Sequence, residues 1–168
     1  MPTVSASIVV AATAEKAFRF IDDYRNIPRL QPHFSAVRLV GDIERGVGAQ
    51  VALEGRFHGI PMKVHNKIIA HREPARLVSI SEGAVLSRST WELEQLDGPA
   101  PATRVTLTVD YKLEKALGGL FMGMGSALWP LFNREIQSMT TESLHRLRDI
   151  LAGAHKGQSP SEKGSLDL

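Results

Sequence analysis

The residue types in this chain that could do acid–base or metal chemistry are above all its six histidines. His58, His65 and His71 do not share one face of a strand at the spacing that metal ligands need. His145 has no histidine or carboxylate partner on its helical stripe, and His155 lies in a polar tail. The chain has no cysteine, which excludes disulfides, thiolate metal sites and a cysteine nucleophile. We therefore expect no metal and no cofactor.

Two residues are candidates for general acid or base catalysis. His33 follows Pro32 close to the expected mouth of a pocket, and Tyr111 ends an inward strand face. Neither lies in a recognised catalytic pattern, because the chain has no glycine-rich phosphate loop and no G-x-S-x-G elbow. Asp22 and Asp23 lie at a helix end, where we expect a solvated face and an ordinary surface ion pair with Arg19.

An uncharged stretch, LGGLFMGMGSALWPLF, runs from Leu117 to Phe132. It is too short for a membrane span of about 20 residues. Its glycines lower helix stability and its methionines adapt to irregular apolar partners, as in a soft-walled entrance to a cavity. The alternatives are a packed core segment, or an exposed patch that forms a homodimer or docks on a membrane surface.

Composition and charge narrow the function classes. The chain has 168 residues, enough for one domain with a sizeable core, and a formal net charge of only +2. Lysine and arginine are scattered among acidic residues, so we expect no nucleic-acid binding. The N-terminal MPTVSASIVVAATA lacks the positive start of a signal peptide and is typical of a strand. We expect no membrane span and a cytoplasmic location.

The elements that must position these residues follow from periodicity. A period of two, interrupted by turn signals, predicts seven strands; their ranges are Val4–Val10, Ala36–Val40, Ala49–Phe57, Met62–His71, Leu77–Ser81, Val85–Leu96 and Arg104–Tyr111. Short connections between successive strands indicate antiparallel hairpins. Each strand has one apolar and one polar face, which predicts a sheet covered on one side.

Helices are predicted before and after this run of strands. Thr13 is a suitable N-cap for a helix over Ala14–Asp23, and Pro28 and Pro32 leave room only for a short second helix or turn. Apolar residues three and four apart predict a long final helix from about Trp129 to about Ala152. The fold class is therefore α+β: a seven-stranded, curved antiparallel sheet around a long C-terminal helix, with two short helices after the first strand. We expect one domain over residues 1–152, followed by a polar, weakly ordered tail over 153–168.

Three strings give this order of elements a family resemblance. They are ASIVVAATAEKAFRFIDDYRNIPRLQP at residues 6–32, the Ser-Thr-Trp-Glu-Leu strand at 89–93, and the end of the final helix, LHRLRDIL. Over about residues 3–152 the chain resembles START-like, SRPBCC-type helix-grip proteins of the polyketide cyclase/dehydrase and lipid-transport branch. Leu30 stands where the family often has tryptophan, and Ala12 where it often has proline; the first change alters the expected mouth of the cavity.

The resemblance and the residue pattern together indicate a binding function. We expect a lipophilic small molecule (a lipid, isoprenoid or polyketide-like compound) in a cavity between sheet and final helix, with apolar burial as the source of affinity. The alternatives are a polyketide cyclase or dehydratase, which the resemblance implies, and a protein-interaction module acting through Leu117–Phe132. The expected ligand-binding residues are inward or cavity-closing side chains: Leu53, Phe57, Val64, Asn66, Ser87, Ser89, Trp91, Val109, Tyr111, Leu120, Phe121, Met124, Trp129, Phe132 and Ile136.

Overall fold

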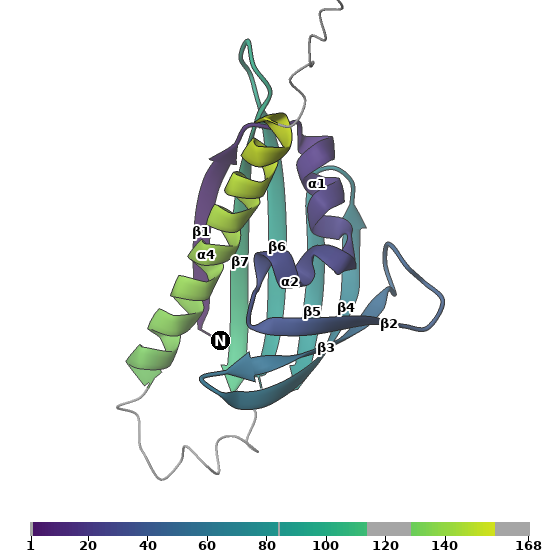
Figure 1. The fold of residues 1–168 in the computed structure, drawn as a ribbon, viewed down its shortest axis with the longest axis vertical. Coiled ribbons are helices and arrows are strands. Elements are labelled where there is room, and N and C mark those ends of the chain that lie inside the picture. Colours follow the sequence, from purple (N-terminus) through teal and green to yellow (C-terminus); the bar gives the residue numbers. More distant parts are fainter. Residues whose placement is uncertain (1, 84, 114–128, 157–168) are drawn as a thin grey trace, which may run out of the picture.

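The chain folds as a curved seven-stranded antiparallel sheet with its helices on the concave side, as a computed structural model shows for residues 2–83, 85–113 and 129–156 (Figure 1). The strands lie in the order β1-β7-β6-β5-β4-β3-β2. This confirms the predicted helix-grip fold. The elements are β1 (Thr3–Val10), α1 (Ala14–Asp22), η1 (Tyr24–Asn26), α2 (Ile27–Leu30), β2 (Phe34–Val40), β3 (Gln50–Phe57), β4 (Ile60–Arg72), β5 (Arg76–Gly83), β6 (Val85–Leu96), β7 (Ala102–Leu113) and α4 (Trp129–Lys156).

The ends of the elements differ from the predicted ones by a few residues. Most strands extend beyond the predicted ranges, because backbone pairing between neighbouring strands continues up to the turns. For example, β4 begins at Ile60 and β7 ends at Leu113. The final helix ends at Lys156 and so passes the expected domain end at residue 152. Residues 157–168 of the expected tail lie outside the described residues.

Helix α1 begins where its sequence predicts. The Thr13 side chain accepts a hydrogen bond from the backbone N–H of Lys16 at 3.2 Å, and the acidic Glu15 lies in the first turn. Its apolar face, with Ala17, Phe18 and Ile21, is buried against the sheet. The helix therefore closes one end of the concave face.

The described residues form two separate apolar clusters in the interior. The larger, which we call the main core, joins α1 and the C-terminal half of α4 to the upper parts of β1, β5, β6 and β7; it contains Phe18, Leu77, Trp91, Leu107 and Leu147 among others (Figure 1). The smaller cluster lies on β2 and β3, where Phe34, Val51 and Leu53 are buried. Burial of apolar surface stabilises both ends of the molecule, but the two clusters do not merge.

One glycine is required for the smaller cluster. A Cβ atom on Gly55 would lie 1.9 Å from the carbonyl oxygen of His33, which also accepts a hydrogen bond from the Arg56 N–H at 3.0 Å. The register of β2 against β3 shifts at this point, between Phe34 and Ala36. Because only glycine allows such a close approach, Gly55 sets how β2 enters the sheet.

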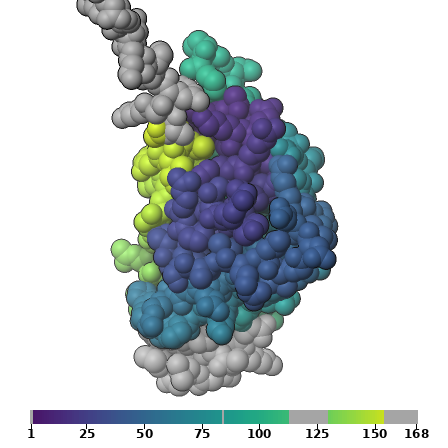
Figure 2. Space-filling view, turned by 45° about the vertical axis from the view of Figure 1, so that its right-hand side comes forward, coloured from purple at the N-terminus to yellow at the C-terminus, as the bar shows by residue number. Residues whose placement is uncertain are grey.

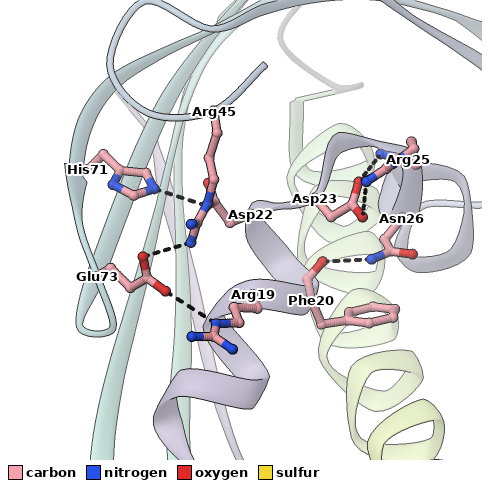
Figure 3. Close-up of polar contacts among 9 residues, drawn as sticks. All are labelled: Arg19, Phe20, Asp22, Asp23, Arg25, Asn26, Arg45, His71 and Glu73. Carbon is pink, nitrogen blue, oxygen red and sulfur yellow. Dashed lines mark hydrogen bonds and ion pairs between the residues drawn. The ribbon is translucent and has the colours of Figure 1, made fainter. Parts of the chain in front are cut away.

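The end of α1 corrects the expectation of a solvated acidic face. The Asp22 side chain is only 2% exposed; it accepts a hydrogen bond from Arg45 and lies 3.0 Å from Nε2 of His71 (Figure 3). Arg19 pairs with Glu73 instead, at 3.6 Å, and Arg45 also donates to Glu73 at 2.7 Å. Arg45 holds the pKa of the Glu73 carboxyl below its usual range. The expectation failed because the loop between β2 and β3, distant in sequence, brings Arg45 onto α1.

No helix among residues 2–83, 85–113 and 129–156 is long and apolar enough to cross a membrane.

Candidate functional site

Polar side chains cross the middle of the concave sheet face. The strand register places Asn66, Ser81, Ser87 and Tyr111 in one row across β4, β5, β6 and β7. The next row contains Ser79 and Ser89, between Ile68 and Val109. We call these six polar residues the polar strip. Because cross-strand neighbours on one face lie within contact distance, the strip is a continuous surface.

The hydrogen bonds of the polar strip leave several groups without a protein partner. Asn66 Nδ2 donates to Ser81 Oγ at 2.8 Å and to Ser79 Oγ at 3.2 Å. Within the described part of the chain, the hydroxyls of Ser87 and Ser89 and the amide oxygen of Asn66 make no hydrogen bond. None of the described buried polar side-chain atoms lacks a partner, so these three groups retain contact with open space.

The exposure of neighbouring apolar residues supports the same conclusion. Val64, Ile68, Val85 and Val109 lie on the concave face, yet all are only half-buried. In the next row of the same face, Leu77, Trp91 and Leu107 are almost completely buried in the main core. The polar strip and its apolar borders therefore form a less completely buried part of the concave face, which we call the candidate space.

The position of α4 explains this space. The helix packs mainly on β1 and β7 and lies toward one edge of the sheet (Figure 1). In Figure 2, α1, α2 and β2 (purple to dark blue) lie beside α4 (green) and cover the molecule from that side. The helices and β2 thus surround the concave face of β4–β6. Asn66, Ser87 and Ser89 on that face nevertheless stay only half-buried.

The two halves of α4 pack differently. The buried side chains all lie from residue 140 onward, in the part that we call the C-terminal half: Thr140, Ser143, Leu144, Leu147 and Leu151. Between Pro130 and Met139 no side chain is buried, and Leu131 is 60% exposed. Glu135 in this N-terminal half lies 3.4 Å from His58 at the tip of the β3–β4 hairpin. The described residues of the N-terminal half therefore lie beside the candidate space without being buried.

Tyr111 links the polar strip to α4. Its side chain is fully buried, and its hydroxyl donates to Oδ1 of Asn133 at 2.5 Å. The ring centroid lies 5.6 Å from that of Phe132. Burial raises the pKa of the Tyr111 phenol, so it stays protonated and acts as a hydrogen-bond donor at neutral pH. Tyr111 therefore holds the first turn of the helix to the end of β7.

His33 occupies a different part of the molecule. Its half-buried ring packs against Phe34, with centroids 4.3 Å apart. Burial lowers the pKa of the imidazole, and the carboxylate of Glu142 on α4 acts weakly in the opposite direction. Asn133 and Glu142 are nine residues apart on the helix, about 13 Å along its axis. His33 and Tyr111 thus approach different levels of α4 and do not form one acid–base pair.

The structure places the other expected ligand-binding residues at several depths. Trp91 belongs to the main core and Leu53 to the smaller cluster. Half-buried positions facing the space or its rim are held by Phe57, Val64, Asn66, Ser87, Ser89, Val109, Phe132 and Ile136. Leu120, Phe121 and Met124 lie outside the described residues, as does the Trp129 side chain. Their expected roles stay predictions.

Sequence reasoning missed Ser79 and Ser81. Both lie on the same alternating face of β5 as Leu77, so the period of two was a sufficient signal. As the sequence analysis expected, His65 and His71 do not share a face: His65 pairs with Glu82 on the convex side, and His71 points inward toward Phe18. The physical reason is a register shift between Ile68 and Ala70, since six residues of strict alternation would put both on one face.

Two open hollows lined by described residues lie elsewhere. The larger, about 850 Å³, runs along a charged side of α4 with Arg134, His145 and Asp149. The other, about 630 Å³, lies between α1, α2 and α4. Neither includes a residue of the polar strip. Drug-sized ligands prefer mostly apolar surroundings with a few polar groups, so we place the candidate site at the polar strip.

Comparison with known proteins shows the family of the chain. A family model described as polyketide cyclase/dehydrase and lipid transport matches residues 1–151. No curated protein matches the chain.

Solved structures share the fold. A protein of Thermus thermophilus is 22% identical, with a TM-score of 0.72, and the match covers 91% of this chain and 99% of that one. An aromatase/cyclase from a Streptomyces species is 16% identical, with a TM-score of 0.66 over 98% and 99% of the two chains. A START superfamily protein from Mycobacterium smegmatis is 17% identical, with a TM-score of 0.61 over 94% and 99%. At these identities the likeness concerns the fold alone.

Proposed function

Because the chain belongs to the polyketide cyclase/dehydrase and lipid transport family, we propose that it binds a hydrophobic small molecule between the polar strip and α4. One observation carries this proposal: seven concave residues of β4–β7 are only half-buried, although apolar clusters close the sheet ends. They are Val64, Asn66, Ile68, Ser81, Ser87, Ser89 and Val109. An apolar ligand that covers these side chains gains about 25 cal/mol for each Å² removed from water.

The surroundings suit such a ligand. Val64, Ile68 and Val109 border the polar strip and supply apolar contact, and the N-terminal half of α4 presents Phe132 and Ile136 on the other side. Between Pro130 and Met139 no side chain of this helix is buried, so this segment can shift toward a ligand without losing core contacts. Lipids, isoprenoids and polyketide-like compounds are the classes that fit an apolar space with a few hydrogen-bonding groups.

Filling the space tests the proposal directly. Ser89 and Thr90 are adjacent in β6 and face opposite sides of the sheet, so Ser89→Trp adds a large side chain to the concave space and Thr90→Trp adds the same one to the convex surface. We expect lipophilic ligands to raise the melting temperature of the wild type and of Thr90→Trp, and not that of Ser89→Trp.

Native mass spectrometry of protein purified from its own host identifies the ligand. We expect a co-purifying lipophile with the wild type and with Thr90→Trp, and its loss from Ser89→Trp. Equal loading of both variants, or no response of the wild type to a broad lipophilic panel, would contradict binding at this site.

Catalysis on a bound chain is the second candidate, and the position of Tyr111 favours it. Its phenol lies in the same row as Asn66 and Ser87 and donates to Asn133, so Tyr111 would position α4 so that the site holds a chain in one folded pose. We expect a cyclase to change the product mixture that a poly-β-keto substrate forms spontaneously. Tyr111→Phe should then abolish the change without abolishing binding.

A further inference from the structure

The hydrogen-bonding groups of the polar strip restrict the polar end of the ligand. We propose that the site, if it binds a lipophile as argued above, selects an uncharged one that carries a hydroxyl group. The inference concerns ligand chemistry and rests on the proposed function for its location only. Two observations support it: some hydrogen-bonding groups of the polar strip have no partner among the described residues, and the described residues of its two rows carry no charge.

The first step concerns the amide of Asn66. Both of its N–H groups are used, since Nδ2 donates to Ser79 and Ser81. Its carbonyl oxygen has no partner in the described part of the chain, and this oxygen can only accept. A ligand that completes this bond must donate a proton, as an alcohol or phenol does and as an ether, ester or ketone does not.

The second step concerns the serines of β6. Ser87 and Ser89 have no hydrogen-bond partner within the described residues, and each hydroxyl can both donate and accept. Ser87 lies in the same row as Asn66, separated from it by Ser81 on β5. A ligand hydroxyl near this row can donate to the Asn66 oxygen and accept from a serine, so both capacities of its oxygen are used.

The third step concerns charge. The lysines and arginines next to these two rows alternate with the inward positions and so lie on the convex face; they are Lys63, Lys67, Arg88 and Lys112. Among the described residues, those in the two rows of the strip are all uncharged: Asn66, Ser81, Ser87, Tyr111, Ile68, Ser79, Ser89 and Val109. Burying a carboxylate without a cation is costly, so an ionised fatty acid should bind poorly.

Three ligands with one chain length separate these features: dodecanol, its methyl ether, and dodecanoate. Their affinities are measured by isothermal titration calorimetry at about pH 8, where a carboxyl is ionised. We expect dodecanol to bind about tenfold more tightly than the ether, the equivalent of one net hydrogen bond, and dodecanoate to bind weakest. An ether that binds as tightly as the alcohol, or dodecanoate that binds most tightly, overturns the inference. If the wild-type protein binds none of the three ligands, the proposed function itself is contradicted.

Variants assign the preference to the strip. Asn66→Leu keeps the branched shape of the side chain and removes its acceptor together with its donors, so it should lower dodecanol affinity about tenfold and leave the affinity for the ether unchanged. Ser87→Ala is the milder variant, chosen because its hydroxyl has no bond within the described structure to lose; it should reduce the preference for the alcohol in the same direction. Ser5→Ala is the matched control, because Ser5 bonds Thr108 on the opposite face. An unchanged alcohol-to-ether ratio in folded Ser87→Ala and Asn66→Leu contradicts the assignment.

Discussion

The two halves of α4 belong to one continuous helix but differ in how deeply their side chains are buried. The C-terminal half buries Leu144, Leu147 and Leu151 in the main core, beside α1 and the upper strands. The N-terminal half has no buried side chain between Pro130 and Met139 and touches the sheet through the Tyr111–Asn133 hydrogen bond and the Phe132 ring. The difference shows that one end of the molecule is used for stability, while the other borders the candidate site.

The sheet repeats this contrast. At the level of Trp91 the concave face is apolar and closed, and at the level of Ser87 it is polar and partly open. Side chains that are kept partly exposed for a ligand add little buried apolar area. In a chain of this size, the main core must therefore supply most of the buried area that stabilises the fold.

The largest expected effect is a difference in stability between the two halves. Leu147→Ala removes a fully buried side chain and should lower the free energy of unfolding by about 2–5 kcal/mol. Ile136→Ala, the matched change in the half-buried N-terminal half, should cost less than about 1.5 kcal/mol. Urea denaturation measures both. Equal losses would mean that the N-terminal half belongs to the core.

The closed end also depends on the buried carboxylate of Asp22. Asp22→Asn keeps the shape but removes the charge that Arg45 and His71 contact, and we expect a loss of about 1–3 kcal/mol. Asp23→Asn is the control: its side chain is 31% exposed, it pairs locally with Arg25, and asparagine is also a good N-cap. The same denaturation experiment would contradict the assigned role if the two variants lost equal stability.

The contact between the open half of α4 and the sheet should be weaker. Tyr111→Phe removes the hydrogen bond to Asn133, whose exposed side chain can bond water instead, so we expect a loss of about 1 kcal/mol. Hydrogen exchange should accelerate at the amides of residues 133–139 and not at those of residues 144–151. Uniform acceleration along the helix would show that the two halves are not separate.

The smallest effect concerns pH at the border between α4 and β2. Burial lowers the pKa of His33 below its ordinary value of 6.5, so the unfolded chain binds a proton more readily than the folded one. This contribution leaves stability unaffected well above pH 6.5 and reduces it as the pH falls through that value. His33→Gln should flatten the stability profile between about pH 7 and pH 5. A profile with the same slope in both proteins would contradict the buried, neutral state of His33.

Much of this molecule follows from local patterns in the sequence. The period of two in Val85–Leu96 and the flanking strands predicted both the strands and their inward faces, because side chains of a strand alternate strictly. Thr13 and the apolar face of Phe18 and Ile21 predicted α1, because capping and helical spacing are local. The inward positions of Asn66, Ser87, Ser89 and Tyr111 were predictable for the same reason.

Other features required the register and the approach of distant segments. Alternation assigns Ser79, Ser81 and Asn66 a face, but only the pairing of β4 with β5 places the amide between the two hydroxyls. The bulge that turns His71 inward has no local sequence signal, and Asp22 is buried because Arg45 from a separate loop lies against it.

By itself, then, the sequence determined the element order, the faces of the strands and the family resemblance, since these depend on neighbours along the chain. Only the tertiary structure decided that α4 packs toward β1, that no side chain between Pro130 and Met139 is buried, and that the polar side chains meet as one strip. These properties depend on how far apart packed elements lie, and that distance is set by the summed contacts of many side chains.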